Sequence, residues 1–201
     1  VGSRIFDFRN SSFTTVEEKT FGYDQSYAVN NSFTFYSLST LVEIKDNNFQ
    51  YINGGDFYLS SQDVVKIGTG LWENSNNYKI YVPYTLIDRY RSDVSWLDFA
   101  DNIYGYAPAN TFEVGTTLPT ESSVDSYTLK WYTENTLANQ VTTVTDPSTI
   151  LYCSISKYKK YYTLKNIASA NCSPYLTDGV TNYHLGDKMP SEKELTLVIN
   201  P

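Results

Sequence analysis

Residues 32–44 read Ser-Phe-Thr-Phe-Tyr-Ser-Leu-Ser-Thr-Leu-Val-Glu-Ile, and this stretch decides the fold class. Aromatic and β-branched residues alternate in part with polar residues along it, which is the period-two pattern of a half-buried strand. Further runs of this kind lie at 64–67, 78–83, 127–132, 140–144, 150–155, 158–164 and 195–199. The sequence therefore predicts a protein built mostly from short strands.

Turn residues separate these runs and suggest how they connect. Asn53-Gly54-Gly55 predicts a hairpin between 49–52 and 57–59, because Asn and Gly tolerate positive φ. Only 92–102 competes for a helix, with Ser92 or Asp93 as its N-cap. We see no internal repeat. We predict an all-β fold, an antiparallel β-barrel or sandwich with long surface loops and at most one short helix.

Length and composition fit one folded domain over residues 1–201, with residues 1–3 expected to be a cloning remnant. Hydrophobic residues make up 41% of the chain and charged residues 18%, as in an ordinary globular protein. A net charge of −7 argues against bulk nucleic-acid binding or polybasic docking to a membrane. No apolar run approaches the ~20 residues of a membrane span, so membrane insertion is not expected.

The sequence contains few residues and motifs that are typical of enzyme active sites. His184 is the single His, and no Gly-x-Ser-x-Gly elbow accompanies it. Ser154 and Lys157 have Ser-x-x-Lys spacing, but on a strand residues three apart point to opposite faces. A glycosidase needs two facing carboxyl groups, for which the candidates are Glu73, Asp98 and Asp101. We predict no enzymatic activity, no cofactor and no metal site.

The two cysteines, Cys153 and Cys172, match no zinc or redox spacing. They form either a disulfide that closes a short local loop or two reduced, buried thiols, and the sequence leaves both alternatives open.

The excess of aromatic residues is the main functional signal, with 19 Tyr, 10 Phe and 3 Trp. Tyr beside Asn, Ser and Gly is typical of adaptable recognition surfaces, and it also suits a sugar with apolar faces and hydroxyl groups. Lys159 and Lys160 form an adjacent basic pair that would favour an acidic or sulfated glycan. The predicted binding residues lie in turns and loops and are Trp72, Asn76, Tyr104, Tyr106, Lys159 and Lys160.

Residues 41–45, Leu-Val-Glu-Ile-Lys, precede residues 53–59, Asn-Gly-Gly-Asp-Phe-Tyr-Leu. With these stretches, its size and its aromatic-rich strands, the chain resembles the projecting capsid spike of astroviruses. The resemblance implies a β-barrel spike on the virion surface that forms a homodimer, binds a host receptor or glycan, and is a target of neutralising antibodies.

Two other functions remain open. The chain is alternatively a carbohydrate-binding or adhesin module of a microbe or phage, either secreted or on the cell surface. A glycoside hydrolase is the third alternative. A two-fold dimer would give an attachment domain avidity, and closed dimers are the commonest homo-oligomers.

Overall fold

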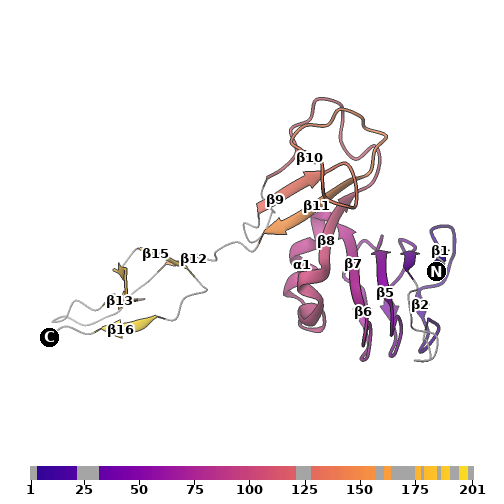
Figure 1. Ribbon diagram of the computed structural model, residues 1–201, viewed down its shortest axis with the longest axis horizontal. Coiled ribbons are helices and arrows are strands. Elements are labelled where there is room, and N and C mark those ends of the chain that lie inside the picture. The colour runs from indigo at the N-terminus through magenta and orange to yellow at the C-terminus, as the bar shows by residue number, and fades with distance from the viewer. Residues whose placement is uncertain are drawn as a thin grey trace. The chain divides into compact units, whose positions relative to one another are not determined.

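The computed structural model describes residues 4–21, 32–120, 128–156, 161–163, 175–177, 179–184, 187–190 and 195–198. The chain divides into two compact units, Val1–Ser156 and Lys157–Pro201 (Figure 1).

The first unit begins with seven strands and continues through a helical segment to four more. The elements are β1 (Arg4–Asp7), β2 (Thr15–Val16), β3 (Phe33–Tyr36), β4 (Glu43–Ile44), β5 (Asn53–Tyr58), β6 (Lys66–Ile67), β7 (Asn76–Pro83), η2 (Tyr84–Leu86), α1 (Ile87–Ser92), η3 (Val94–Asn102), β8 (Ile103–Ala107), β9 (Thr128–Tyr132), β10 (Gln140–Val141) and β11 (Leu151–Ser156).

Stacked coils form most of this unit. Strands β1, β3, β5, β7 and β8 pair in parallel in that order, and the two-residue strands β2, β4 and β6 form a second parallel sheet. Each turn of the coil contributes one strand to each sheet, from β1–β2 to β3–β4 to β5–β6. Strands β5 and β7 of the main sheet are visible side by side in Figure 1. This is a solenoid, in which each coil buries its apolar interior against the next.

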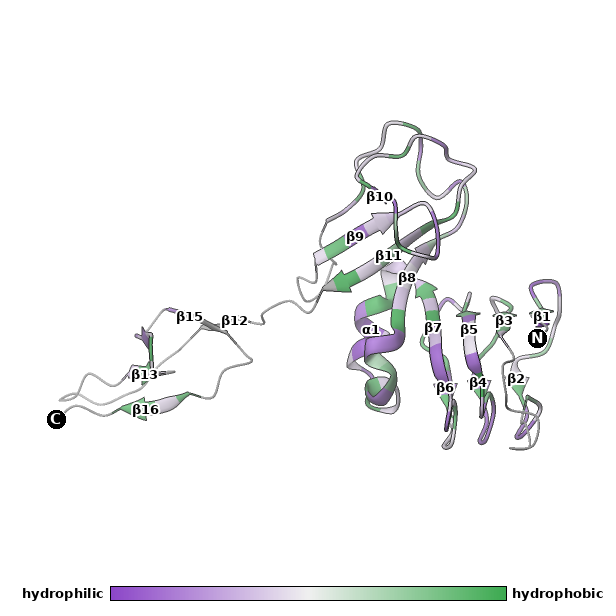
Figure 2. Ribbon diagram, viewed as in Figure 1, coloured by the Kyte–Doolittle hydropathy of each residue, from purple (hydrophilic) through white to green (hydrophobic). Residues whose placement is uncertain are grey.

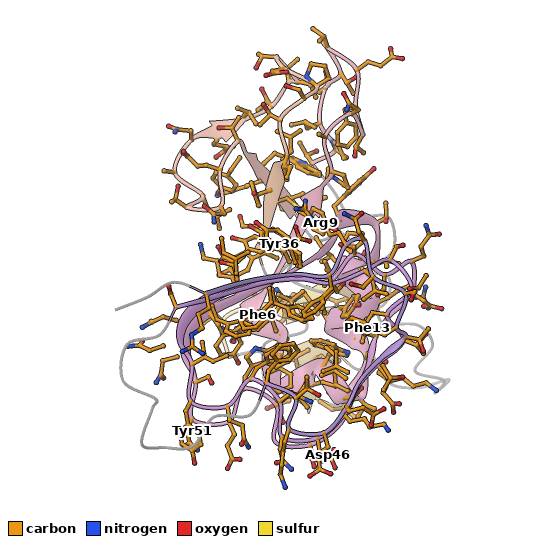
Figure 3. The ribbon with its side chains drawn as sticks, turned by 90° about the vertical axis from the view of Figure 1, so that its right-hand side faces the viewer. Phe6, Arg9, Phe13, Tyr36, Asp46 and Tyr51 are labelled. Carbon is orange, nitrogen blue, oxygen red and sulfur yellow. The ribbon has the colours of Figure 1, made fainter. Side chains whose placement is uncertain are left out.

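The core follows from the register of these coils. Phe57 pairs with Phe35, 22 residues earlier, and with Ile80, 23 residues later, which in turn pairs with Ile103. All four side chains are at most 1% exposed. Figure 3 shows Phe6 and Phe13 on this inner side of the sheet. Many hydrophilic residues lie at the turns between coils, at the lower edge of Figure 2, and others lie on α1.

Buried Asn48 bridges two coils at the corner opposite the main sheet. Its Nδ2 donates hydrogen bonds to the carbonyl oxygens of Glu17 and Lys45, each at 2.9 Å, and its Oδ1 accepts one from the backbone N–H of Phe21 at 2.9 Å. Asn48 is fully buried, so it satisfies backbone groups that a strand ladder does not reach.

A helical segment closes the coil between β7 and β8. Asp93 caps η3 by accepting a hydrogen bond from the backbone N–H of Ser95 at 2.9 Å, which agrees with one of the two predicted caps. Most of the predicted helix is 3-10 in geometry, and the short α1 precedes it. Trp96 anchors the segment, since it is fully buried and donates from Nε1 to the carbonyl of Val65 at 2.8 Å.

Beyond β8 the main sheet becomes antiparallel, in the order β8-β11-β9-β10. Cys153 lies at the centre of β11, fully buried and free, and its burial raises the pKa of the thiol. A Cβ at Gly105 would overlap the side chains of Ile87 and Cys153, so this position requires glycine. Cys172, the other cysteine of the chain, lies outside the described residues.

The predominance of β structure is confirmed, and α1 is the single α-helix among the described residues. The prediction of an antiparallel barrel or sandwich is wrong for the coils, because their strands run parallel and the described sheets do not close. The hairpin predicted at 53–55 is also wrong. Asn53 and Gly54 begin strand β5, where Gly54 has φ of 92°, and Gly55 fits beneath the carbonyl of Phe33.

The second unit contains only short strands among its described residues. Strand β12 (Tyr161–Thr163) pairs antiparallel with β15 (Lys188–Pro190). Strand β13 (Tyr175–Thr177) lies between β14 (Asn182–Tyr183) and β16 (Thr196–Val198), also antiparallel.

Candidate functional site

A column of tyrosines crosses the outer face of the parallel sheet, opposite the core. Tyr36 of β3, Tyr58 of β5, Tyr81 of β7 and Tyr104 of β8 pair in register. We call these four residues the tyrosine ladder. Ring centroids are 4.7 Å apart between Tyr36 and Tyr58 and 4.8 Å between Tyr58 and Tyr81, with planes within 16° of parallel, and the last step is 5.9 Å and tilted. Because side chains alternate along strands, the same coil spacing that stacks the core also stacks these rings.

A cation lies at each end of the tyrosine ladder. The guanidinium carbon of Arg9 is 4.6 Å from the centroid of Tyr36, and Nζ of Lys79 is 5.7 Å from that of Tyr104. Both distances are within the range of cation–π attraction. Figure 3 shows Arg9 beside Tyr36 on the outer side of the sheet. Since cations and neighbouring rings cover the faces of Tyr36 and Tyr58, a ligand would meet mainly the edges and hydroxyl groups of these two rings.

Arg9 is held by Asp7 in a two-pronged ion pair. Nε of Arg9 donates to Oδ1 of Asp7 at 2.9 Å, and Nη2 donates to Oδ2 at 2.6 Å. These hydrogen bonds, first among the causes, lower the pKa of Asp7 to about 2, and Asp7 raises the pKa of Arg9. The pair is therefore fully ionised at neutral pH, with the guanidinium oriented by both Asp7 and Tyr36.

Two more tyrosines extend the aromatic surface across the sheet. Tyr106 of β8 pairs in register with Tyr152 of β11. Both rings are edge-on to Tyr58, with centroids at 5.9 Å and 6.4 Å. The hydroxyl of Tyr106 donates to Oγ of Ser60 at 3.1 Å, and the hydroxyl of Tyr58 donates to that of Tyr152 at 3.5 Å. These contacts fix the rings before any ligand arrives.

The turn after β9 covers the middle of the tyrosine ladder. The carbonyl of Asn135 accepts hydrogen bonds from the hydroxyl of Tyr81 at 3.0 Å and from Nζ of Lys79 at 2.6 Å. Its side-chain amide donates to Oδ2 of Asp56 at 2.7 Å. Tyr81 is fully buried as a result, whereas Tyr36 and Tyr104 remain partly exposed.

An open cavity of about 420 Å³ lies beside the Tyr36–Tyr58 half of the tyrosine ladder. Its volume is within the range of ~300–1,000 Å³ that is common for small-molecule sites. Arg9 and Ser60 bring polar side chains to the wall, three tyrosines bring aromatic rings, and prolines and aliphatic side chains supply the rest. The lining residues are Arg9, Tyr36, Tyr58, Ser60, Pro83, Tyr106, Pro108, Ala109 and Ile150.

Burial opposes ionisation of the tyrosine hydroxyls of this site, which are neutral at physiological pH. Desolvation is the largest cause of the raised pKa of Tyr36, Tyr58 and Tyr106. At physiological pH these groups therefore act as hydrogen-bond donors and acceptors and carry no charge. Arg9 is the charged side chain among the described residues that line the cavity.

The six predicted binding residues have different positions. Tyr106 lines the cavity, although it is only 7% exposed, and Tyr104 belongs to the tyrosine ladder. The prediction that Trp72 lies in an exposed loop is wrong. It is 3% exposed and stacks on Phe49 at 5.5 Å inside the core. Asn76 is exposed at the opposite end of β7 from Pro83. Lys159 and Lys160 lie outside the described residues.

Arg9, Tyr36 and Tyr58 were not predicted as site residues. A signal for the tyrosines was available, because Tyr36, Tyr58, Tyr81 and Tyr104 recur at the coil spacing of 22 or 23 residues. Arg9 gave no comparable signal, since its position depends on the bend of the chain after β1.

Within the described residues, no cluster of three or more His, Cys, Asp or Glu side chains is arranged to hold a metal ion. The helices described are all too short or too polar to cross a bilayer.

Comparison with protein-family models, with curated proteins and with solved structures finds no match for this chain.

Proposed function

We propose that this chain is a non-enzymatic attachment domain that binds a saccharide in the cavity beside the tyrosine ladder. The observation that carries the proposal is the composition of the cavity wall, where Arg9, Ser60 and three tyrosines occur together with Pro83, Pro108 and Ile150. A sugar presents both C–H faces and hydroxyl groups, so it matches such a wall. The rigid solenoid would hold these groups in place, which lowers the entropic cost of binding.

Binding without hydrolysis is favoured by the side chains around the cavity. A glycoside hydrolase requires two carboxyl groups on either side of the scissile bond. No Asp or Glu occurs among the described residues that line this cavity. The nearby Asp7 already accepts two hydrogen bonds from the side chain of Arg9. The third alternative from the sequence therefore has less support than a binding role.

Between the two attachment roles, the fold supports a carbohydrate-binding or adhesin module of a microbe or phage more than an astrovirus-like spike. The spike resemblance implied a β-barrel, whereas the coils form a solenoid. Solenoids present long faces on which side chains repeat in register, and the tyrosine ladder repeats in this way, with Tyr36 and Tyr104 at its ends still partly exposed. The homodimer, the host receptor and the virion location implied by the resemblance stay predictions.

A glycan array tests the proposal, followed by affinity measurements on variants of the cavity wall. We expect Arg9→Ala and Tyr106→Phe to weaken glycan binding, Arg9→Ala by about tenfold, as expected when charge-assisted hydrogen bonds are lost. Arg89→Ala is the matched control, because Arg89 also pairs with an aspartate and is similarly exposed, at 55% against 56% for Arg9. Equal loss in Arg89→Ala and Arg9→Ala, or an array without any bound glycan, would contradict the proposal.

A further inference from the structure

The ion pair between Arg9 and Asp7 bears on which saccharides the cavity accepts. Asp7 engages Nε and Nη2 of the guanidinium. An arginine carries five N–H groups, so about three remain, on Nη1 and Nη2. Those N–H groups can donate to hydroxyl oxygens. The side of the guanidinium most suited to a carboxylate is, however, already occupied by one.

The charge of the site leads to the same conclusion. Arg9 is the charged side chain among the described residues lining the cavity, and Asp7 places an equal negative charge at 2.6 Å from its Nη2. An anionic ligand would gain little net attraction from a cation that is paired in this way. It would also experience repulsion from Asp7, whereas an uncharged sugar would keep its hydrogen bonds to the remaining N–H groups.

We infer that the cavity selects uncharged saccharides over acidic ones, and that Asp7 is the residue that sets this preference by acting through Arg9. The inference rests on the proposed saccharide-binding function. It also differs from the sequence-based expectation, in which Lys159 and Lys160 would favour an acidic or sulfated glycan. Asp7 is a positioning residue here, since it orients and neutralises Arg9 and is not itself among the cavity-lining residues.

The test uses matched probes that differ by one functional group. The probes are the methyl glycosides of glucose, galactose and mannose, and the corresponding methyl uronides, in which a carboxylate replaces the C6 hydroxymethyl group. Titration of isotope-labelled protein, followed by NMR, gives the affinity for each probe and reports whether signals of the cavity shift. We expect the wild-type protein to bind at least one neutral glycoside about fivefold more tightly than its uronide, as expected for one charge contact at a partly exposed site.

Two substitutions change the preference in opposite directions. Asp7→Asn keeps the side-chain shape but removes the negative charge, so it should bring the uronide to at least equal affinity. Arg9→Gln leaves Asp7 without its cation and should widen the preference for neutral glycosides. Glu17→Gln is the control for net charge, because Glu17 forms a surface ion pair of the same kind, with Lys45 at 2.7 Å. It should leave the preference unchanged.

Several results would overturn the inference. Equal affinity of the wild-type protein for uronides and neutral glycosides would contradict the inference and leave saccharide binding intact. An unchanged preference in the Asp7→Asn variant would do the same. If Asp7→Asn does not fold, an Arg9→Gln variant that loses or reverses the preference has the same consequence. If no glycoside of either kind shifts signals of the cavity, the proposed function itself fails, and the inference fails with it.

Discussion

Arg9 illustrates how a surface residue acquires a fixed position. A free arginine side chain has many rotamers and loses about 2 kcal/mol of entropy when one is selected. Here Asp7 holds one edge of the guanidinium and the Tyr36 ring holds one face. Exposed ion pairs contribute little to stability, so the consequence of this arrangement is a pre-oriented donor at the cavity and not a more stable fold.

The first prediction concerns the pKa of the Asp7 carboxyl group. Its carboxyl should titrate at a pKa of about 2, because the hydrogen bonds from Arg9 favour the charged form. The folded-state pKa lies below the unfolded value of about 4, so the contribution of the pair is present above that pH and disappears as the pH falls towards 2. NMR of the aspartate carboxyl carbons measures this midpoint directly. A midpoint near 4 would show that the ion pair does not persist in solution.

At the scale of elements, strands such as β3, β7, β9 and β11 were predicted, whereas β1, β2, β8 and β13 to β15 were not, and the partners of the strands were not predicted either. Alternation along 78–83 identified β7, because one strand carries its own periodicity. Whether a neighbouring strand runs parallel depends on the path between them, and the two-residue strands β4 and β6 are too short to show alternation. Asn53-Gly54-Gly55 has the chemistry of a hairpin turn, yet here it begins a strand. Local turn propensity was overridden by the stacking of the coils.

The candidate site was predictable only in part, for the same reason. An excess of tyrosine indicated a recognition surface, and Tyr104 and Tyr106 were identified as members of it. Trp72 was misassigned because a Gly- and Asn-rich neighbourhood usually indicates an exposed loop. In this solenoid the corner between coils turns inwards, so that Trp72, with φ of 50°, stacks on Phe49. Because the 22- or 23-residue repeat was not recognised in the sequence, aromatic residues of the core could not be distinguished from those of the outer face.

Asn48 provides the second prediction, which belongs to the scale of elements. Asn48→Ala leaves buried backbone groups of two coils without their hydrogen bonds, and each such loss costs about 1–3 kcal/mol. We expect the unfolding free energy to fall by about 2–4 kcal/mol and the melting temperature by roughly 5–15 °C. Calorimetry measures both quantities. Asn53→Ala is the control, since Asn53 is exposed at the start of β5 and should change the free energy by less than about 0.5 kcal/mol. Similar losses in the two variants would contradict the bridging role of Asn48.

In the first unit, the same strand register aligns side chains on both faces of the main sheet. The coil spacing stacks Phe35, Phe57 and Ile80 inside, and the same register stacks Tyr36, Tyr58 and Tyr81 outside. The packing of the core and the stacking of the tyrosine ladder therefore depend on the same register. A shift of one coil relative to the next would disrupt the core and the tyrosine ladder together, so the cavity should be lost only when the unit unfolds.

The last prediction follows from the number of tyrosines that are buried as neutral groups. Desolvation is the largest cause of the raised pKa of Tyr58, Tyr81 and Tyr90. In the unfolded chain these hydroxyls would ionise near pH 10. Their contribution to stability is therefore complete below that pH, and it decreases as the pH rises, because the unfolded state then loses protons that the folded state retains.

Absorbance of tyrosinate measured during an alkaline titration tests this prediction. We expect Tyr58, Tyr81 and Tyr90 to ionise only when circular dichroism reports unfolding. Tyr81→Phe is the informative variant, since it removes one ionisable hydroxyl and its hydrogen bond to Asn135 but keeps the ring stacked. It should lose some stability at pH 7, and that deficit should shrink above pH 10, where ionisation in the unfolded state penalises only the wild-type residue. Complete ionisation of all tyrosines near pH 10 while the β signal persists would mean that the tyrosine ladder is open to water in solution, and both the cavity and the saccharide site built on it would then have to be abandoned.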